Sequence, residues 1–314
     1  MSNYHNIKSN SRFLLEVELT PLQGERFQPT GFSDLGPARY TLPDGTEMLL
    51  VESNQSMANR MEAVCWDYEN EDLIPVLQGL PYIKVNYKDK PLTNSILEAH
   101  RINSEYILYD LKKNTPATFK KKLTQEIDYS PEKPVDWKNF RQALVKYDPN
   151  SIIHGSFLEE ISGRLRVTRA LSSFIEAENI NVVTSGGVKF SRVEPGKKQG
   201  EGNVPYSRTE FTAERIIAYF NIDLSLLKGY GFDKDLVDLF ISLSLLKIKK
   251  LLKYGLRLRT ACDLKMKKEP ISSSHSGFQL PSEQELEADC KELINKCSDK
   301  WFANPPVTEL TYEK

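Results

Sequence analysis

A dense run of basic side chains lies between Lys247 and Lys268, where nine lysines and arginines face a single acid, Asp263. Such a cluster carries enough positive charge to hold several phosphate groups. A strand here would present Arg257 and Arg259 about 7 Å apart on one face, roughly the spacing of successive phosphates, and the fork of a guanidinium suits phosphate oxygens. The alternative is a solvated helix face followed by an exposed strand face.

A second candidate is the segment SNQSMANRMEA, at the start of an expected helix. Its polar side chains are Ser53, Gln55, Ser56, Asn59 and Arg60. Hydrogen-bond donors beside the positive end of a helix favour anion binding. The alternative is ordinary capping by Ser53 or Asn54, with Met57 and Met61 packing in the core.

A glycine-rich stretch, SGGVKFSRVEPGKKQGEGNVPYSR, combines backbone amides that can approach an anion with several cations. These cations are Lys189, Arg192, Lys197, Lys198 and Arg208. The stretch lacks the lysine followed by Ser or Thr that a P-loop requires, so nucleotide hydrolysis is disfavoured. The alternative is a mobile surface loop. Arg164, Arg166 and Arg169 form a third cationic patch with the same alternatives.

Catalytic and metal-binding patterns are sparse. The four histidines (His5, His100, His154 and His275) occur in none of the HxH, HExxH or Cys/His spacings typical of zinc. His154 could act as a general base in metal-independent RNA cleavage, although a lone histidine is more often structural. Asp34, Asp44 and Asp263 are single acids. We therefore expect neither a metal nor another cofactor.

Composition sets further limits. The chain has 314 residues, 39% of them hydrophobic, so it can bury a large core. Its 42 basic and 43 acidic residues nearly cancel, and nucleic-acid binding would have to come from local clusters. The four cysteines have no CxxC spacing, and the first residues lack an apolar secretion signal, which predicts a reduced, cytoplasmic setting. The longest apolar run is interrupted by charges, so no membrane span is expected.

The first half of the chain shows a mixture of strand and helix signals. Alternating apolar residues predict a strand over Arg12 to Leu19, and the turn at Pro43-Asp44-Gly45 predicts a hairpin. A helix is expected from Ser53 to near Asp67, followed by a strand at 82–87 and a capped helical turn beginning at Thr93 or Asn94. Between about 103 and 150 the chain is lysine-rich and irregular, with one helix candidate, DWKNFRQALVKY, and is interpreted as an insertion.

The second half predicts flexible loops at Gly186-Gly187 and a strand-bearing stretch, FTAERIIAYFNIDLSLL. The clearest helix runs from Asp233 to Tyr254, with separate apolar and polar faces, and Gly255 ends it. One strand follows, with Leu256, Leu258, Cys262 and Leu264 on its apolar face. The tail is expected to hold a charged amphipathic helix. Residues 1–268 thus form the predicted core, and 269–314 a linker and C-terminal helix.

Several long strings occur in one order that resembles a known family. They are RFLLEVELTPLQGERFQPTGFSDLG, ESNQSMANRMEA, SGGVKF, GNVPYSRTEFTA, AYFNIDL and YGLRLRTACDL. Together they resemble the backbone subunit of type I-G (formerly I-U) CRISPR Cascade complexes, a member of the RAMP superfamily. The resemblance extends from about Arg12 to Lys265, and the insertion and the tail contribute little to it.

The resemblance implies an α+β fold: a modified RRM or ferredoxin-like core, in which helices pack on one face of an antiparallel sheet, with inserted hairpins and loops that form a thumb and web. The insertion at about 103–150 would be either the thumb or a helical insert. It also implies a non-catalytic, cytoplasmic, antiviral-defence protein that polymerises head to tail along guide RNA. The guide would pair with target DNA, and other Cascade subunits would complete the complex. A subunit that repeats along any guide must hold phosphates and sugars and leave the base edges free.

On these matching strings and charges, phosphate contacts are expected from Arg60, Lys189, Arg192, Arg208, Arg257 and Arg259. Sugar or phosphate hydrogen bonds are expected from Gln55, Ser56 and Asn59. The competing interpretation is a RAMP endoribonuclease that processes precursor guide RNA, with His154 or His100 as the base and a nearby cation stabilising the charge of cleavage. A free-standing nucleotide-binding protein is disfavoured because the P-loop lysine is missing.

Overall fold

A computed structural model of the chain describes residues 7–32, 34–108, 118–190 and 203–312. Its largest sheet has seven strands in the order β14-β15-β1-β13-β12-β5-β4, and every neighbouring pair is antiparallel. The strands are β1 (Arg12–Pro21), β4 (Arg39–Thr41), β5 (Glu47–Glu52), β12 (Leu171–Phe190), β13 (Asn203–Asp223), β14 (Arg257–Arg259) and β15 (Cys262–Met266). The structure therefore confirms the α+β class with a large antiparallel sheet.

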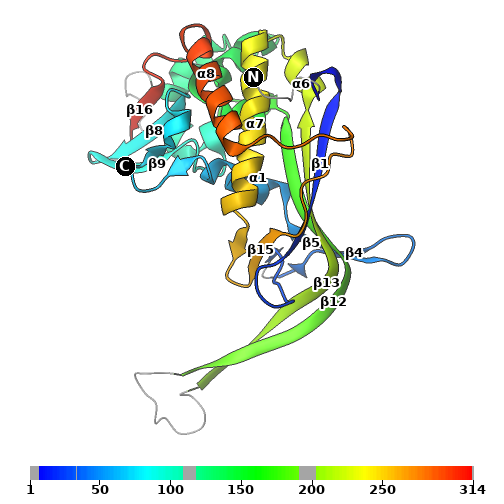
Figure 1. The fold of residues 1–314 in the computed structure, drawn as a ribbon. Coiled ribbons are helices and arrows are strands. Elements are labelled where there is room, and N and C mark those ends of the chain that lie inside the picture. The colour runs from blue at the N-terminus through cyan, green and yellow to red at the C-terminus, as the bar shows by residue number, and fades with distance from the viewer. Residues whose placement is uncertain (1–6, 33, 109–117, 191–202, 313–314) are drawn as a thin grey trace.

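Helices bury one face of this sheet. The longer helices are α1 (Asn54–Ala63), α4 (Trp137–Tyr147), α7 (Lys234–Tyr254) and α8 (Glu283–Trp301). The helices α1 and α7 contact each other and pack against β12 and β13, while α8 packs along α7 (Figure 1). Phe13, Leu15, Val17 and Leu19 of β1 point into this core, as the alternating sequence predicts. The opposite face of the sheet is only half-buried.

A second sheet and several short elements complete the description. The three-stranded sheet has the order β16-β8-β9, formed by β8 (Tyr82–Tyr87), β9 (Lys90–Asn94) and β16 (Val307–Thr311), with β16 parallel to β8. The short strand pairs are β2 (Gly31–Phe32) with β3 (Gly36–Pro37), β6 (Trp66–Asp67) with β7 (Asp72–Leu73), and β10 (Ser156–Phe157) with β11 (Arg166–Val167). The short helices are α2 (Glu105–Leu108), α3 (Phe119–Glu126), α5 (Asn150–Ile153), α6 (Leu224–Gly229), η2 (Pro75–Leu77) and η3 (Arg101–Asn103).

Several local predictions are confirmed. Ser53 caps α1, since its hydroxyl accepts a hydrogen bond from the Ser56 amide. The helix predicted from Asp233 is α7, and the structure adds that Asp233 caps it and that Ser282 forms a capping box with Glu285 at the start of α8. The predicted turn at Pro43-Asp44-Gly45 joins β4 to β5. Capping and turn chemistry therefore predict these element boundaries correctly.

Three local predictions are wrong, and a fourth is confirmed. The first helix ends at Ala63, because the chain then turns into β6. The capped turn predicted at Thr93 or Asn94 begins at Asn94, whose side chain accepts from the amides of Ile96 and Leu97 and whose carbonyl accepts from the amide of Glu98. Gly186 and Gly187 lie inside β12. The strand after Gly255 is a hairpin of two strands that breaks between Arg259 and Cys262.

The longest structural feature outside the helical layer is the hairpin of β12 and β13. Its two strands pair continuously from Leu171↔Ile222 to Phe190↔Asn203, apart from an irregularity around Asn179. Neighbouring strands cover only the inner part, since β1 pairs with β13 from Ile216 onward and β5 pairs with β12 no further than Glu178. The outer half therefore projects from the body as a two-stranded ribbon (Figure 1).

The expected insertion is mainly helical. Its helices α3, α4 and α5 contribute buried side chains, among them Leu123, Phe140 and Leu144, to the same continuous core as the sheet. Strand β16 and helix α8 of the tail likewise pack against this core through β8 and α7. The domain boundaries at 103–150 and 268 stay predictions.

Candidate nucleic-acid interface

The polar residues of α1 lie on its outer surface and at its N-terminus. Gln55 and Asn59 are one turn apart and exposed, and Ser56 is half-buried beside the Ser53 cap. An exposed amide can donate to a phosphate or to a ribose hydroxyl. The segment therefore acts as a cap, and its two exposed amides are also available to a ligand.

Arg60 and Arg259, 199 positions apart in the sequence, meet at one carboxylate. The guanidinium of Arg259 donates to Glu52 at 2.7 Å, and that of Arg60 lies 3.4 Å from the same oxygen. Arg259 also donates to the carbonyl of Gln28 at 2.9 Å, and Arg60 to the carbonyl of Leu258 at 2.5 Å. Glu52 is 1% exposed, whereas about a quarter of each arginine side chain remains accessible.

This arrangement has two consequences for the predicted phosphate contacts. Much of the donor capacity of Arg60 and Arg259 is used within the protein, where it ties α1, β5 and β14 together. Two guanidiniums against one carboxylate still leave a surplus positive charge beside the amides of α1. The contact of these arginines with RNA stays a prediction.

Arg257 and Arg259 do not share an environment. Arg257 is exposed, makes no ion pair with any described residue, and lines a hollow of about 390 Å³ together with Arg26, Glu210 and Asp263. The turn between β14 and β15 brings these residues to the loop that follows β1. Its free guanidinium makes Arg257 the simpler candidate for a phosphate contact.

Lys189 and Arg208 lie on the projecting hairpin, away from α1. Both are exposed, and the guanidinium of Arg208 lies 5.0 Å from the ring centroid of Tyr206. Tyr206 is paired with Gly187, and a Cβ atom on Gly187 would meet its ring at 2.8–3.2 Å, so the ring lies across the glycine. Arg192, Lys197 and Lys198 fall outside the described residues.

The basic run from Lys247 to Lys268 is not the continuous cationic surface that the sequence predicts. Its lysines are largely engaged with protein groups: Lys247 is 1% exposed, Lys250 binds Glu283 and Glu287, Lys253 binds Glu283, and Lys267 and Lys268 bind Glu18. Helix α7 lies between the sheet and α8, so it is buried on nearly every side. Arg257 and Lys265 are the exposed cations of this run that form no ion pair with a described residue.

A groove of about 1090 Å³ opens beside α1. Its walls come from α1, from residues 98–106, from residues 154–169 and from the start of β12. Gln55 and Asn59 line it, and so do His100, Arg166 and Arg169. The structure thus brings two residues of the predicted site and two of the third cationic patch to one cavity.

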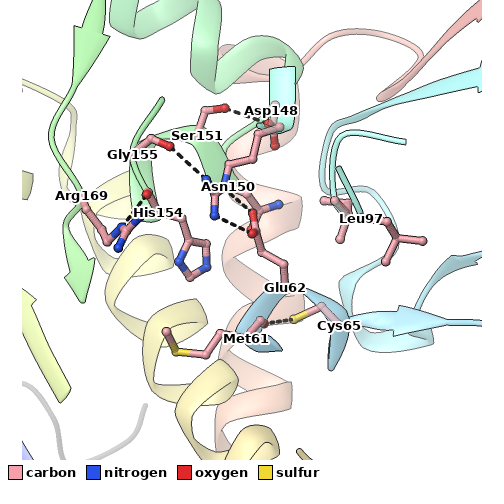
Figure 2. A network of polar contacts seen from close by, with 12 residues as sticks. Met61, Glu62, Cys65, Leu97, Asp148, Asn150, Ser151, His154, Gly155 and Arg169 are labelled. Carbon is pink, nitrogen blue, oxygen red and sulfur yellow. Dashed lines mark hydrogen bonds and ion pairs between the residues drawn. The ribbon is translucent and has the colours of Figure 1, made fainter. Parts of the chain in front are cut away.

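A buried network of charged side chains supports this groove (Figure 2). Glu62 of α1 and Arg101 of η3 form a bidentate pair, with both N···O distances 2.7 Å. Lys247 of α7 donates to Asn150 at 2.5 Å and lies 2.8 Å from Nε2 of His154. Arg169 donates from Nε to the His154 carbonyl at 2.9 Å. Elements from four parts of the chain are joined here.

The network perturbs the pKa of its members through burial. Burial raises the pKa of the Glu62 carboxyl, and the charges of Arg101 and Lys247 oppose that rise. Burial also raises the pKa of Asp148, which accepts a hydrogen bond from Ser151, to about 7. The same cause, aided by the charge of Lys247, lowers the pKa of His154 well below its usual value.

These facts weaken His154 as a general base. The Lys247 ammonium can only donate, so Nε2 of the His154 imidazole accepts a hydrogen bond from it and is not available to take a proton from RNA. The ring is also only 1% exposed. Its Nδ1 atom is buried and has no partner among the described residues. His154 contributes to the lining of the groove, but its ring exposes too little surface to take a proton from bound RNA. His100 is exposed at the groove, 54 positions earlier in the chain.

Several residues of this region were missed by sequence reasoning. Glu52, Glu62 and Arg101 gave no motif, because each depends on a partner that folding brings from far along the chain. Phe157 was missed because a single aromatic residue carries no spacing signal. Among the described residues no three His, Cys, Asp or Glu side chains gather as a metal-binding group. None of the helices in the described ranges combines the length and apolar character needed to cross a bilayer.

The large antiparallel sheet, the helical layer on one face and the projecting ribbon define an α+β protein with a cationic, amide-bearing corner at α1. The model of the family "CRISPR-associated protein GSU0053 (Cas_GSU0053)" matches residues 13–182, more than half of the chain, and the chain belongs to this family. No curated protein matches it.

Two solved structures are similar over most of their length at low sequence identity. One is a chain of a "CRISPR RNA-guided surveillance complex, pre-nicking", with 13% identity, 92% of this chain and 89% of that chain covered, and a TM-score of 0.43. The other is Csc2 of Thermofilum pendens, with 10% identity, 94% and 80% covered, and a TM-score of 0.31.

Proposed function

We propose that this chain is the RNA-binding backbone subunit of a Cascade-type CRISPR effector, of subtype I-G. In this role it polymerises head to tail along guide RNA, presents the guide to target DNA and joins other subunits, without catalysing a reaction. Membership of a CRISPR-associated family supports the setting. The sequence strings described above support the subtype.

The fold supports the proposal at the level of topology. Four adjacent strands have the order β15-β1-β13-β12, and the chain passes through them as strand, α1, strand, strand, α7, strand. This is the β-α-β-β-α-β succession of ferredoxin-like and RRM cores. The remaining strands and hairpins are then additions to that core.

The observation that carries the proposal is the meeting of Arg60 and Arg259 at Glu52, next to the exposed amides of Gln55 and Asn59. A surplus guanidinium charge beside uncharged donors suits a phosphate and its sugar, and reads no base edge. Such a site is sequence-independent, as a subunit that repeats along any guide requires. The endoribonuclease alternative receives less support, since His154 is buried against Lys247.

Two substitutions at this ion pair test the site with opposite expected signs. Arg259→Gln removes a positive charge, and Glu52→Gln removes the negative one, although both break the same contact. If phosphates bind here, Arg259→Gln should weaken binding to single-stranded RNA and lower the slope of log K against log salt by about 0.7. Glu52→Gln should strengthen binding and raise that slope.

The measurement uses the full chain, several unrelated RNA sequences and a salt series. Lys138→Ala is the control, because Lys138 is an exposed cation on α4, away from the groove. Shifts of both variants in the same direction would show that breaking the pair acts only through structure. That result contradicts the proposal. So does a wild-type protein that binds none of the RNAs at low salt.

A further inference from the structure

Phe157 is an exposed aromatic side chain at the edge of the groove beside α1. It lies on β10, lines the groove, and is 43% exposed. Phe157 pairs with Arg166 of the neighbouring strand β11, and the guanidinium carbon of Arg166 lies 5.8 Å from the ring centroid of Phe157. A phenyl ring and a guanidinium side by side form a surface on which a planar group can stack.

Backbone contacts fix the short β10–β11 strand pair that carries Phe157 and Arg166. Gly155 has φ of +79°, and a Cβ atom there would lie 3.1 Å from the Arg169 amide and from the Val167 carbonyl, so the strands approach closely just before Phe157. The amide of Leu158 donates to the carbonyl of Leu165 at 2.8 Å, and Arg169 binds the carbonyl of His154. The stacking surface is therefore positioned by backbone contacts on both sides.

The charges of the groove select which part of a nucleotide fits. Four glutamates contribute to its lining: Glu98, Glu105, Glu159 and Glu160. Three arginines, Arg101, Arg166 and Arg169, also line the groove, but the guanidinium of Arg101 is paired with the buried Glu62. The four carboxylates weaken the attraction of the remaining cations for a phosphate chain. The amides of Gln55 and Asn59 both donate and accept, so they can meet the edge of any base. The groove suits an uncharged, planar, hydrogen-bonding ring.

We propose that the groove takes one unpaired nucleobase of single-stranded RNA, stacked on Phe157 and Arg166, while the phosphates remain outside near Arg60 and Arg259. This inference rests on the proposed function and adds a base subsite to it. Stacking tolerates any base, so the subsite is compatible with binding that does not depend on sequence. The wider cavity leaves room for the amides of α1 to contact the same nucleotide.

The test measures binding of the full chain to single-stranded RNA that carries the fluorescent base 2-aminopurine. Phe157→Ala should weaken binding by about 5- to 150-fold, the range typical of losing one aromatic stack, and should reduce the change in 2-aminopurine fluorescence. Phe157→Trp should restore both. Trp137→Ala is the matched control, because Trp137 is also 43% exposed but lies on α4, outside the groove lining.

A second RNA in which the bases are replaced by abasic sites separates stacking from folding. Wild type should bind this strand more weakly than the intact strand, whereas Phe157→Ala should bind the two strands nearly equally. If wild type binds intact and abasic strands equally, the base subsite is wrong although RNA binding stands. If Phe157→Ala binds intact RNA as tightly as wild type, the groove serves another occupant, such as a basic peptide. Failure of wild type to bind any RNA overturns the proposed function itself.

Discussion

Arg101 is the most constrained side chain of the network beneath the groove. Its backbone has φ of +53°, in the left-handed region that a long side chain rarely adopts, and the residue is 6% exposed. A residue held in this conformation costs on the order of 1–3 kcal/mol. The bidentate contact with Glu62 offsets that cost, because paired charge-assisted hydrogen bonds are the strong ones. The pair therefore fixes η3 against α1.

Removal of the Glu62 carboxylate should strongly destabilise the fold. Glu62→Ala leaves a buried guanidinium without its partner, and such a break costs about 3–5 kcal/mol. The free energy of unfolding from urea titration measures the loss. Glu178→Ala is the control, since its partner Arg215 is 47% exposed and the loss of a surface pair costs at most about 1 kcal/mol. Equal losses in the two variants would contradict the structural role of Glu62.

Asp148 should make stability depend on pH in a predictable direction. Its folded-state pKa of about 7 exceeds the value of 3.8 expected in the unfolded chain, so the folded state binds the proton more tightly. The contribution of Asp148 to the free energy of unfolding is therefore largest below about pH 4 and falls as the pH rises through 7. Asp148→Asn keeps an oxygen that can accept the hydrogen bond from Ser151 and removes the titration.

The difference in unfolding free energy between wild type and Asp148→Asn isolates this effect. We expect the wild type to lose roughly 2–4 kcal/mol relative to the variant between pH 4 and about pH 8, and nothing more above that range. Urea unfolding at a series of pH values provides the measurement. A difference that does not change with pH, or that changes in favour of wild type, would refute the raised pKa.

At the residue scale, the sequence predicts chemical type better than environment. Ser53 was identified as a candidate cap, because capping depends only on neighbours in the chain. Lys247 was taken as part of a cationic surface, and this was wrong because its partners Asn150 and His154 lie almost a hundred positions away. The convergence of Arg60 and Arg259 was unpredictable for the same reason: a shared buried carboxylate is a property of the tertiary fold.

At the scale of elements, the β12–β13 hairpin shows how a glycine pair can belong to a strand. Gly186 pairs with Ser207 and Gly187 with Tyr206, within one continuous ladder. A Cβ atom on Gly186 would lie 2.3 Å from the backbone oxygen of Tyr206, which no side chain permits. The glycines thus allow a close strand approach and a flat tyrosine ring, where the sequence suggested a loop.

Gly186→Ala should loosen the outer half of this hairpin without unfolding the body. The added methyl group must push the two strands apart, and beyond the backbone bridge between Phe27 and Phe211 only the β12–β13 ladder holds that half. Hydrogen exchange should show faster exchange of the amides between 180 and 190, with the amides of α7 unchanged. Gly163→Ala is the control, because a Cβ atom there meets nothing within 4 Å. Unchanged protection in Gly186→Ala would contradict the close approach.

Elements with a strong period were predicted, and those set by long-range pairing were not. The strand β1 and the helices α4, α7 and α8 carry clear periods, and their existence is confirmed. The strands β9, β10 and β11 have two to five residues and depend on partners for their form. To predict that α7 is buried on nearly all sides, one would need to know that α8 packs along it. Glu283 and Glu287 of α8 pair with Lys250 of α7.

At the scale of the whole molecule, the α+β class with a large antiparallel sheet is implied by the family resemblance and is confirmed by the strand order. The helical packing of residues 118–153 into the common core was not expected of an insertion. Where few apolar residues stand among many lysines, no helical period can be recognised, and the sequence does not distinguish a helical segment from an irregular loop.

Assembly should be driven by RNA and should scale with its length. The free chain is expected to remain monomeric at about 0.15 M salt, since the proposed stacking of copies needs a shared RNA strand. Mass photometry with a guide-length RNA and with one twice as long should show twice as many copies on the longer strand. Filaments without RNA, or a copy number independent of RNA length, would contradict this expectation.

The parallel pairing of β16 with β8 has a consequence for synthesis of the chain. Tyr82 and Val307 are neighbours in that sheet, although more than two hundred residues separate them. A strand with an unpaired edge is a template for pairing with other chains, and non-local contacts form late in folding. While ribosomes translate the intervening segment, one edge of β8 therefore stays uncovered. The nascent chain depends on dilution or on chaperones until residues 307–311 emerge and cover that edge.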